Sequence, residues 1–418
     1  MNFRSPAPVA ASGVAFGGME RGALLLGGAH GSLAVARSLG RQGIPVWFVA
    51  ADKLVPQYSR YVARTFSWAG AEAPNALAFL LELGRRHHLD GWVLFPGGDE
   101  EARMVSRHCQ ALSSIYRVVT PPWEIMRWAA DKRLTNERAQ SLGVDFPWSH
   151  YPKGREDLEQ LQCRFPVILK PTVRSGNNAF VQAKAWRVDD RATLLSRYDQ
   201  AVSMVGERGI VLQEMIPGNG AAQFSYAALW DRGSPVASLV ARRSRQYPID
   251  FGYTSTFVET IENAEVEEAA SRFLTSLNYS GLVEVEFKFD ARDNRYKILD
   301  VNARTWAWIG LGAIAGVDFP HLQWRLAMGE ELARLRGKEG ASWMHALRDF
   351  VAVCQEVRAG SMSLSCYLKS LHRPMEFAAF SPDDPVPGAI DMPLVFSHLI
   401  TRRLPNLARA AVKSLSAH

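Results

Sequence analysis

The sequence predicts an α/β protein with a Rossmann-like first domain, a central α+β region and a mostly helical C-terminal extension. Apolar strand-like runs alternate with helical patterns in the first 130 residues, and short strand-length segments follow from residue 165 to 306. Helical patterns dominate after that, roughly over residues 321–336 and 342–358. The chain has 418 residues, which is long enough for two or three domains. A hydrophobic content of 47% with 22% charged residues is ordinary for a globular protein.

The first domain opens with a strand, a glycine-rich loop, a helix and a second strand. Residues 23–26 and 44–49 are the apolar strands, and the loop reads Gly-Gly-Ala-His-Gly over residues 27–31. This order resembles a dinucleotide-binding fold, but the glycine spacing is GGxxG and not GxGxxG, so the signal is weak. We favour the alternative, in which the glycines only allow a tight strand-to-helix turn. Asp99, after a later strand, is more typical of a helix N-cap than of a ligand.

The most informative stretch is a predicted β-hairpin over residues 281–306. Apolar and charged side chains alternate along its first strand, and Asp300, Asn302 and Arg304 follow at spacings of two on its second strand. Residues two apart on a strand share a face, so Glu286 can project beside Asp300 and Asn302. Two carboxylates and an amide oxygen suit Mg²⁺ or Mn²⁺, and an arginine beside them suits a developing anion.

A solvated hairpin with alternating charges is the alternative interpretation of this stretch. The apolar sequence that follows it, with Trp306 and Trp308, is unusual for an exposed hairpin end. We therefore favour a metal site.

Three further segments carry residues of interest. A predicted helix over residues 123–142 contains Lys132, and a predicted strand over residues 165–171 ends with Lys170. A polar loop follows this strand and leads to a second predicted strand at residues 179–182. Another predicted strand begins at residue 210 and contains Glu214. Lysines on separate elements could bind different phosphates of a nucleotide, although most lysines are simply exposed.

Together these segments resemble the ATP-grasp superfamily, with an ATP-binding domain like that of carbamoyl-phosphate synthase. Four motifs occur in the family's order over about residues 125–320: Asp-Lys at 131–132, Phe-Pro-Val-Ile-Leu-Lys-Pro at 165–171, Val-Leu-Gln-Glu-Met-Ile-Pro-Gly at 211–218, and Glu286 with Asp-Val-Asn-Ala-Arg at 300–304. The family pattern ends E-x-N-x-R, so Asp300 stands where a glutamate is usual. The shorter carboxylate makes bidentate bridging of a metal less certain.

The resemblance implies a role for each matching residue. Phosphate and nucleotide binding is expected at Lys132, Lys170, Ser175, Gly176, Gln213, Glu214, Met215 and Ile216. Metal binding is expected at Glu286, Asp300 and Asn302. Arg304 is expected to stabilise the transferring phosphoryl group, and Arg242 and Arg245 are expected to hold the substrate. A solvated basic loop is the alternative for the last two.

The resemblance also implies a domain organisation and an activity. The predicted parts are a Rossmann-like pre-ATP-grasp domain (1–122), a small ATP-grasp subdomain (123–208), a large subdomain with the metal site (209–330) and a helical C-terminal extension (331–418). The predicted activity is that of an ADP-forming ligase that uses ATP and Mg²⁺ to join a carboxylate to an amine. A bicarbonate-activating carboxylase or carbamoyl-phosphate-type enzyme, a non-catalytic nucleotide-binding protein and an oxidoreductase remain alternatives.

Composition limits the partners and the compartment. A net charge of +6 does not call for nucleic acid, and no run of 18 apolar residues predicts a membrane span. Four scattered cysteines fit a reducing cytoplasm. The last 26 residues carry four basic residues and no acid, which could give weak contact with an anionic membrane, although a helix packed on its own domain is the more usual outcome. A homodimer is left open.

Overall fold

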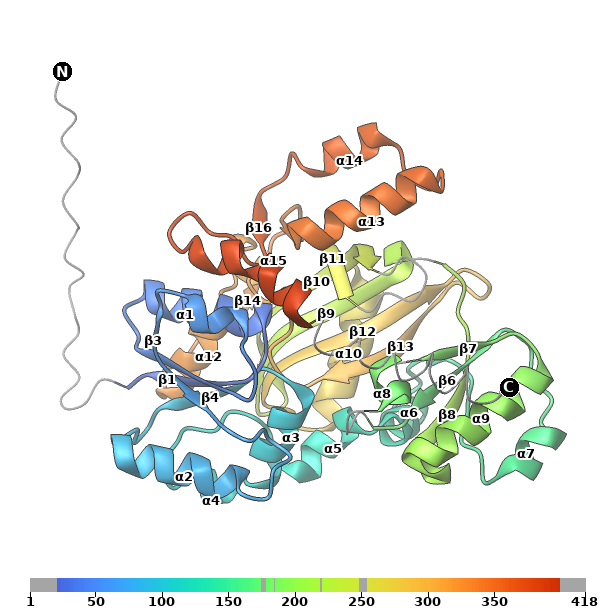
Figure 1. The fold of residues 1–418 in the computed structure, drawn as a ribbon, viewed down its shortest axis with the longest axis horizontal. Coiled ribbons are helices and arrows are strands. Elements are labelled where there is room, and N and C mark those ends of the chain that lie inside the picture. Colours follow the sequence, from blue (N-terminus) through green and yellow to red (C-terminus); the bar gives the residue numbers. More distant parts are fainter. Residues whose placement is uncertain (1–20, 174–177, 184, 219, 248–253, 399–418) are drawn as a thin grey trace.

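The computed structural model describes residues 21–173, 178–183, 185–218, 220–247 and 254–398, and these residues form three β-sheets. In Figure 1 the first sheet (blue) and the smallest sheet (green) lie at opposite ends of the molecule, and the large sheet lies between them. The four basic residues of the predicted C-terminal end, Arg402, Arg403, Arg409 and Lys413, lie outside the described residues. Among the helices that are described, none is long and apolar enough to cross a bilayer.

The first sheet is parallel and confirms the Rossmann-like prediction. Its strand order is β3-β2-β1-β4. The strands are β1 (Ala23–Leu26), β2 (Val46–Ala50), β3 (Val62–Ser67) and β4 (Val93–Pro96), and the helices are α1 (His30–Arg41), α2 (Ala76–His87), α3 (Asp99–Arg107) and α4 (Cys109–Leu112), with the 3₁₀ turn η1 (Val55–Tyr58).

Alternation of side chains along β1 explains why helices cover both faces of this sheet. Leu25 joins the core that contains Val35 and Leu39 of α1, whereas Leu24 joins the core beneath α2 and α3. Both faces of the sheet are therefore buried, as is usual for parallel strands. The core on the α1 side continues into the large sheet, so the two layers share one hydrophobic interior.

The remaining sheet has four strands, as the first sheet does, but its strands hold fewer residues, and we call it the smallest sheet. It is antiparallel, with the order β5-β8-β6-β7. Its strands are β5 (Ser149–His150), β6 (Val167–Pro171), β7 (Trp186–Val188) and β8 (Ile210–Glu214). The helices of this region are α5 (Trp123–Ala130), α6 (Lys132–Ser141), α7 (Arg155–Gln160), α8 (Ala179–Ala183) and α9 (Arg191–Val205), with the 3₁₀ turn η2 (Glu207–Gly209). The predicted helix over residues 123–142 is interrupted at Asp131.

The strand predicted at residues 179–182 is wrong, because these residues form α8. Asn178 lies just before this helix and its Oδ1 accepts from the N–H of Val181 at 3.0 Å, which satisfies a donor of the first turn. β7 pairs with β6 in place of the predicted strand.

The large sheet has the order β13-β12-β9-β10-β11-β15-β16, and β14 pairs with β10. Its strands are β9 (Gln223–Asp231), β10 (Ser234–Tyr247), β11 (Thr254–Ile261), β12 (Gly281–Asp290), β13 (Arg295–Asn302), β14 (Leu335–Arg336), β15 (Ser342–Met344) and β16 (Met375–Phe377). The 3₁₀ turn η3 (Gly220–Ala222) precedes β9. α10 (Ala264–Ser276) covers one face through Val266 and Phe273, and α11 (Leu311–Ile314) and α12 (Phe319–Ala327) join the core on the other.

The C-terminal part is helical but also adds strands to the large sheet. Its helices are α13 (Ala346–Arg358), α14 (Leu364–Ser370) and α15 (Val386–His398), at the top of Figure 1. The helix expected from residue 342 begins at residue 346, because residues 342–344 pair with β11 as β15. The helix expected over residues 321–336 ends at Ala327.

Candidate functional site

The acidic face lies at the edge of the large sheet, on β12 and β13. These strands pair antiparallel, with Glu284 opposite Asn302 and Glu286 opposite Asp300. Asn302 Nδ2 donates to Glu286 Oε1 at 2.9 Å and to Glu284 Oε2 at 3.2 Å. The structure therefore brings together the three residues that the hairpin pattern selected as oxygen ligands.

Glu284 is the buried member of this face, with 4% of its surface exposed. Its carboxylate also accepts from Ser225 Oγ at 3.0 Å and from Trp308 Nε1 at 3.1 Å. Burial, together with the charge of neighbouring Glu286, raises the pKa of Glu284 to about 7. Glu284 thus holds the side chain of Asn302 in place.

Cations from separate elements approach the acidic face. Lys132 Nζ lies 2.8 Å from Asp300 Oδ1, and Arg243 Nη2 lies 3.4 Å from Glu286 Oε2. Asp131 places Lys132 at the start of α6, because its side chain accepts from the N–H of Arg133 and caps that helix. Positive and negative groups therefore alternate around one small space, as a site for a metal-bound polyphosphate requires.

Arg304 links the acidic face to the first domain. Its Nη2 donates to Asn302 Oδ1 at 3.1 Å, and its Nε donates to Asp99 Oδ1 at 2.5 Å. Asp99 is the first residue of α3, at the carboxyl end of β4. The N-cap position expected for Asp99 is held by Gly98, so Asp99 instead fixes the guanidinium of Arg304.

The glycine-rich loop of the first domain packs against the same region. A Cβ atom on Gly31 would lie 2.6 Å from the carbonyl oxygen of Trp306, two residues beyond Arg304. A Cβ atom on Gly28 would lie 2.8 Å from the Cα of Gly97 in the loop after β4. Close backbone packing thus accounts for these glycines without a dinucleotide.

One cleft of about 410 Å³ gathers most of the residues selected from the sequence. The acidic face and Arg304 line one wall. The lining also includes Lys132, Lys170, Gln213, Glu214, Met215 and Ile216. Lys170 Nζ donates to Gln213 Oε1 at 2.8 Å, so β6 and β8 of the smallest sheet present both side chains to the cleft. Ser175 and Gly176 lie outside the described residues, and their predicted role stays a prediction.

Glu214 already has several partners at the end of β8. Its carboxylate accepts from Arg292 Nη2 at 2.6 Å, from the N–H of Trp148 at 2.9 Å and from Lys297 Nζ at 3.1 Å. Lys297 also contacts the buried Asp290 at 2.8 Å. Glu214 thus joins the smallest sheet to the β12–β13 turn, beside its predicted role in nucleotide binding.

Arg242 and Arg245 lie away from the cleft, and Arg243, which the sequence analysis did not select, lines it. Arg242 Nη2 lies 2.5 Å from Glu259 Oε1. Arg245 is buried and donates to both carboxylate oxygens of Asp349 on α13 at 2.8 Å. Neither is among the described residues that line the cleft, whereas Arg243 is. A substrate role for Arg242 and Arg245 stays a prediction.

A bulge on β10 explains this arrangement. Arg242 is paired with Glu259, Arg243 with Val258 and Arg245 with Phe257, so Ser244 is an extra residue in its strand. Because of this extra residue, the side chain of Arg245 lies on the same face of β10 as that of Arg242. Of the three arginines, Arg243 is the one on the face toward the cleft.

Comparisons with known proteins agree with this geometry. Residues 253–335 match the family described as "Carbamoyl-phosphate synthase L chain, ATP binding domain", and this segment contains Glu286, Asp300, Asn302 and Arg304. The biotin carboxylase domain of 2-oxoglutarate carboxylase from Hydrogenobacter thermophilus superposes with a TM-score of 0.61 at 16% identity, over 78% of this chain and 74% of that chain. An L-amino acid ligase from Bacillus licheniformis superposes with a TM-score of 0.58 at 18% identity, over 73% and 74%. The chain has an ATP-grasp fold.

A curated relative also matches this chain in sequence. It is a D-aspartate ligase from Enterococcus faecium (strain Aus0004), 24% identical over 277 residues. The match covers 61% of this chain and 64% of the relative, which is slightly less than two thirds of its length.

Proposed function

We propose that this ATP-grasp protein is an ADP-forming ligase that activates a carboxylate as an acyl phosphate and joins it to an amine. The observation that carries the proposal is the meeting of Glu286, Asp300 and Asn302 with Lys132 and Arg304 at one cleft. The similar D-aspartate ligase and L-amino acid ligase favour an amino acid or a related compound as a substrate.

The nucleotide is proposed to lie between the smallest sheet and the large sheet. Lys132 and Lys170 would bind its phosphates as mobile point charges. The backbone from Gln213 to Ile216, with Glu214, would bind the base and ribose, and Ser175 and Gly176 would cover the phosphates through backbone N–H groups.

The donor set on the acidic face fits Mg²⁺ or Mn²⁺. Two carboxylates and an amide oxygen are hard oxygen ligands, and Glu286 and Asp300 are directly opposite each other on paired strands. Lys132 and Arg243 now partner these carboxylates, and both cations would be free to contact nucleotide phosphates if Glu286 and Asp300 held a metal instead. When bound, the metal supplies charge neutralisation at the β- and γ-phosphates.

The reaction would have two steps. A carboxylate oxygen of the acid substrate attacks the γ-phosphorus of ATP, the bond to the β–γ bridging oxygen breaks, and ADP leaves. The amine then attacks the acyl carbon, the C–O bond to phosphate breaks, and the amine loses a proton as the amide forms. Arg304, held by Asp99, stabilises negative charge on the transferring group, and positioning supplies most of the remaining acceleration.

Bicarbonate activation on the same scaffold is the second candidate. The similar biotin carboxylase domain was solved with MgADP and bicarbonate, which supports a small-acid substrate at such a cleft. The two candidates differ in the acid, because bicarbonate would give carboxyphosphate where an amino acid gives an aminoacyl phosphate.

ADP release over a panel of substrates tests the proposal. Purified full-length chain with Mg²⁺-ATP should release ADP when an amino acid and an amine are supplied together, and mass spectrometry should detect the amide. ADP release that requires only bicarbonate would replace the ligase by the second candidate. Nucleotide binding without ADP release under any condition would support a non-catalytic protein.

The variant Glu286→Gln tests the assignment of Glu286 as a metal ligand. It should lower turnover by about 10²–10³-fold, because it removes one charged ligand at the transferring phosphate. Glu268→Gln is the matched control, since Glu268 is exposed on α10. Equal activity of the two variants would overturn the metal assignment.

We also propose that the protein lies in the cytoplasm and forms a homodimer. Its basic C-terminus is proposed to make weak contact with anionic membranes. The compartment and the membrane contact rest on composition alone. Sedimentation with anionic vesicles tests the membrane contact, and light scattering of the purified chain tests the homodimer.

A further inference from the structure

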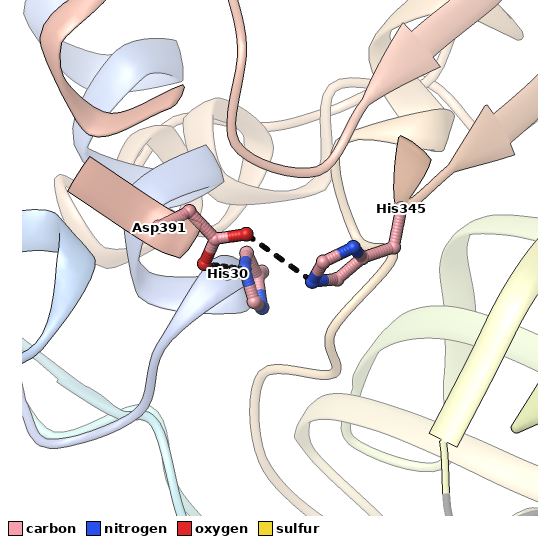
Figure 2. Close-up of side chains that lie close together, drawn as sticks. All are labelled: His30, His345 and Asp391. Carbon is pink, nitrogen blue, oxygen red and sulfur yellow. Dashed lines mark hydrogen bonds and ion pairs between the residues drawn. The ribbon is translucent and has the colours of Figure 1, made fainter. Parts of the chain in front are cut away.

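A second group of side chains with metal-ligand chemistry lies outside the cleft. His30 is the first residue of α1, His345 precedes α13 and Asp391 lies on α15. Figure 2 shows the two imidazole rings and the carboxylate converging from these three elements. His30 Nε2 lies 2.9 Å from Asp391 Oδ1, and His345 Nε2 lies 3.3 Å from Asp391 Oδ2.

All three side chains are buried, with exposed fractions of 9%, 2% and 6% for His30, His345 and Asp391. Among the residues that the structure describes, none forms a hydrogen bond with His345 Nε2, although Asp391 Oδ2 lies 3.3 Å from it. A buried polar atom of this kind requires a partner such as a water molecule or an ion. The group therefore contains a nitrogen directed into the cluster that its protein neighbours do not satisfy.

We propose that His30, His345 and Asp391 bind a divalent transition-metal ion of the Zn²⁺ type. Two imidazoles and one carboxylate form a nitrogen-rich set, which suits Zn²⁺ better than Mg²⁺. One ligand atom from each residue lies within 4.8 Å of the others. Tetrahedral Zn²⁺ with bonds of about 2.1 Å needs ligand atoms roughly 3.4 Å apart, so shifts on the order of 1 Å complete the geometry.

The ring arrangement is compatible with this geometry. The imidazole centroids are 4.7 Å apart at an interplanar angle of 70°. Two histidines on one Zn²⁺ place their ring centroids about 5 Å apart when the bonds are about 2.1 Å long and the angle between them is tetrahedral. Three protein ligands leave one coordination position for water.

Metal binding would change the tautomer of His345. Its Nδ1 now accepts from the N–H of Arg348 at 3.5 Å and caps α13, so Nε2 carries the ring proton. A metal at Nε2 displaces that proton, and the neutral ring then carries its proton on Nδ1 and loses the cap. A long cap of 3.5 Å is a small loss compared with coordination of a structural ion.

The ion would join parts of the chain that are far apart in sequence. It would fix α15 against both α1 and α13. His30 is also adjacent to Gly31, which packs on the backbone of Trp306 beside the cleft. The site goes beyond the proposed ligase activity and acts as a cross-link between the first domain and the C-terminal helices.

Metal retention by the full-length chain tests the proposal. Protein stripped with a chelator is loaded with Co²⁺, dialysed against Mg²⁺ and measured by elemental analysis and visible absorption. Wild type should keep about one Co²⁺ per chain with the absorption of a nitrogen-ligated ion, and Zn²⁺ should displace it. The same result is expected for Glu286→Gln, which separates this site from the cleft.

His345→Gln and Asp391→Asn should each weaken Co²⁺ binding by at least about tenfold. His372→Gln and Asp90→Asn are the matched controls and should bind as wild type does, because both side chains are exposed. Circular dichroism verifies folding. If His345→Gln fails to fold, a Zn²⁺-dependent rise in Tm in wild type but not in Asp391→Asn decides in favour of the site. No retained metal in wild type, or equal retention in wild type and Asp391→Asn, overturns it.

Discussion

Arg243 and Arg245 are two residues apart on β10 and both approach a carboxylate, yet they lie in opposite environments. Arg245 is sealed against Asp349 by two hydrogen bonds of 2.8 Å, with Phe257 and Tyr367 near its guanidinium. Arg243 lines the open cleft and lies 3.4 Å from Glu286. The guanidinium of Arg245 is fully engaged by its bidentate pair and cannot also bind a ligand. The longer contact of Arg243 at the cleft can be exchanged for a contact with a phosphate.

The difference teaches that charge pairing alone does not mark a site. The Arg245–Asp349 pair is buried on both sides and holds α13 to the large sheet. The charges around Glu286 are shared among several partners and border a cavity. A substitution in the Arg245–Asp349 pair should therefore mainly lower stability, whereas a substitution among the charges around Glu286 should mainly lower activity.

The largest effect is expected for Asp349→Asn. It leaves the guanidinium of Arg245 buried without its charge partner, so the free energy of unfolding should fall by about 3–5 kcal/mol. Urea denaturation measures this change. Activity per folded molecule should be retained, and a stability equal to wild type would show that the pair contributes nothing net.

The next effect is expected for Arg243→Gln. Turnover should fall by about 10²–10³-fold if Arg243 moves onto a phosphate, because one positive charge at the transferring group is lost. Urea denaturation should show a smaller fall in the free energy of unfolding than for Asp349→Asn, because Arg243 makes one long ion pair at the cleft, whereas Asp349 is fully buried. The comparison fails if Arg243→Gln unfolds like Asp349→Asn while its turnover is unchanged.

Local patterns explain what could be predicted from the sequence. The β12–β13 hairpin follows from period-two alternation and a polar turn, so the positions of Glu286, Asp300 and Asn302 on one face were predictable. The parallel first sheet likewise follows from its apolar runs and glycine-rich turn. These features depend on neighbours in sequence.

Features that depend on distant partners were not predictable. Residues 342–344 form β15 because β11 lies beside them, about 85 residues earlier in the chain. Asp99 meets Arg304 across more than 200 residues. The bulge at Ser244 leaves no mark in a run of arginines, so the selection of Arg242 and Arg245 instead of Arg243 had no local signal against it.

A smaller effect is expected for Glu284→Gln, through Mg²⁺ affinity. The Glu284 carboxylate accepts hydrogen bonds from Asn302, Ser225 and Trp308. A glutamine amide in its place cannot accept from all three donors. Loss of such support typically weakens metal binding by about 10–100-fold. Titration calorimetry with Mg²⁺ and nucleotide measures the change.

The same residue predicts a pH dependence. The pKa of Glu284 is raised to about 7 by burial and by Glu286, so the carboxyl group takes up a proton as pH falls through that value. A cation is attracted to the ionised form, and Mg²⁺ affinity should therefore increase from pH 6 to pH 8 in wild type. In Glu284→Gln this dependence should be absent. A persistent slope in the variant would assign the titration to another group.

The smallest effect is expected for Arg242→Gln. Arg242 is partly exposed, and its partner Glu259 would keep Arg373 Nη1 at 2.6 Å and Ser244 Oγ at 2.6 Å. The free energy of unfolding should therefore change by less than about 1 kcal/mol, and KM for ATP should be unchanged. The informative quantity is KM for the acid substrate. If it rises while kcat is constant, Arg242 contributes to binding the substrate carboxylate, as the sequence predicted. If it does not, substrate recognition belongs to the side of β10 that carries Arg243.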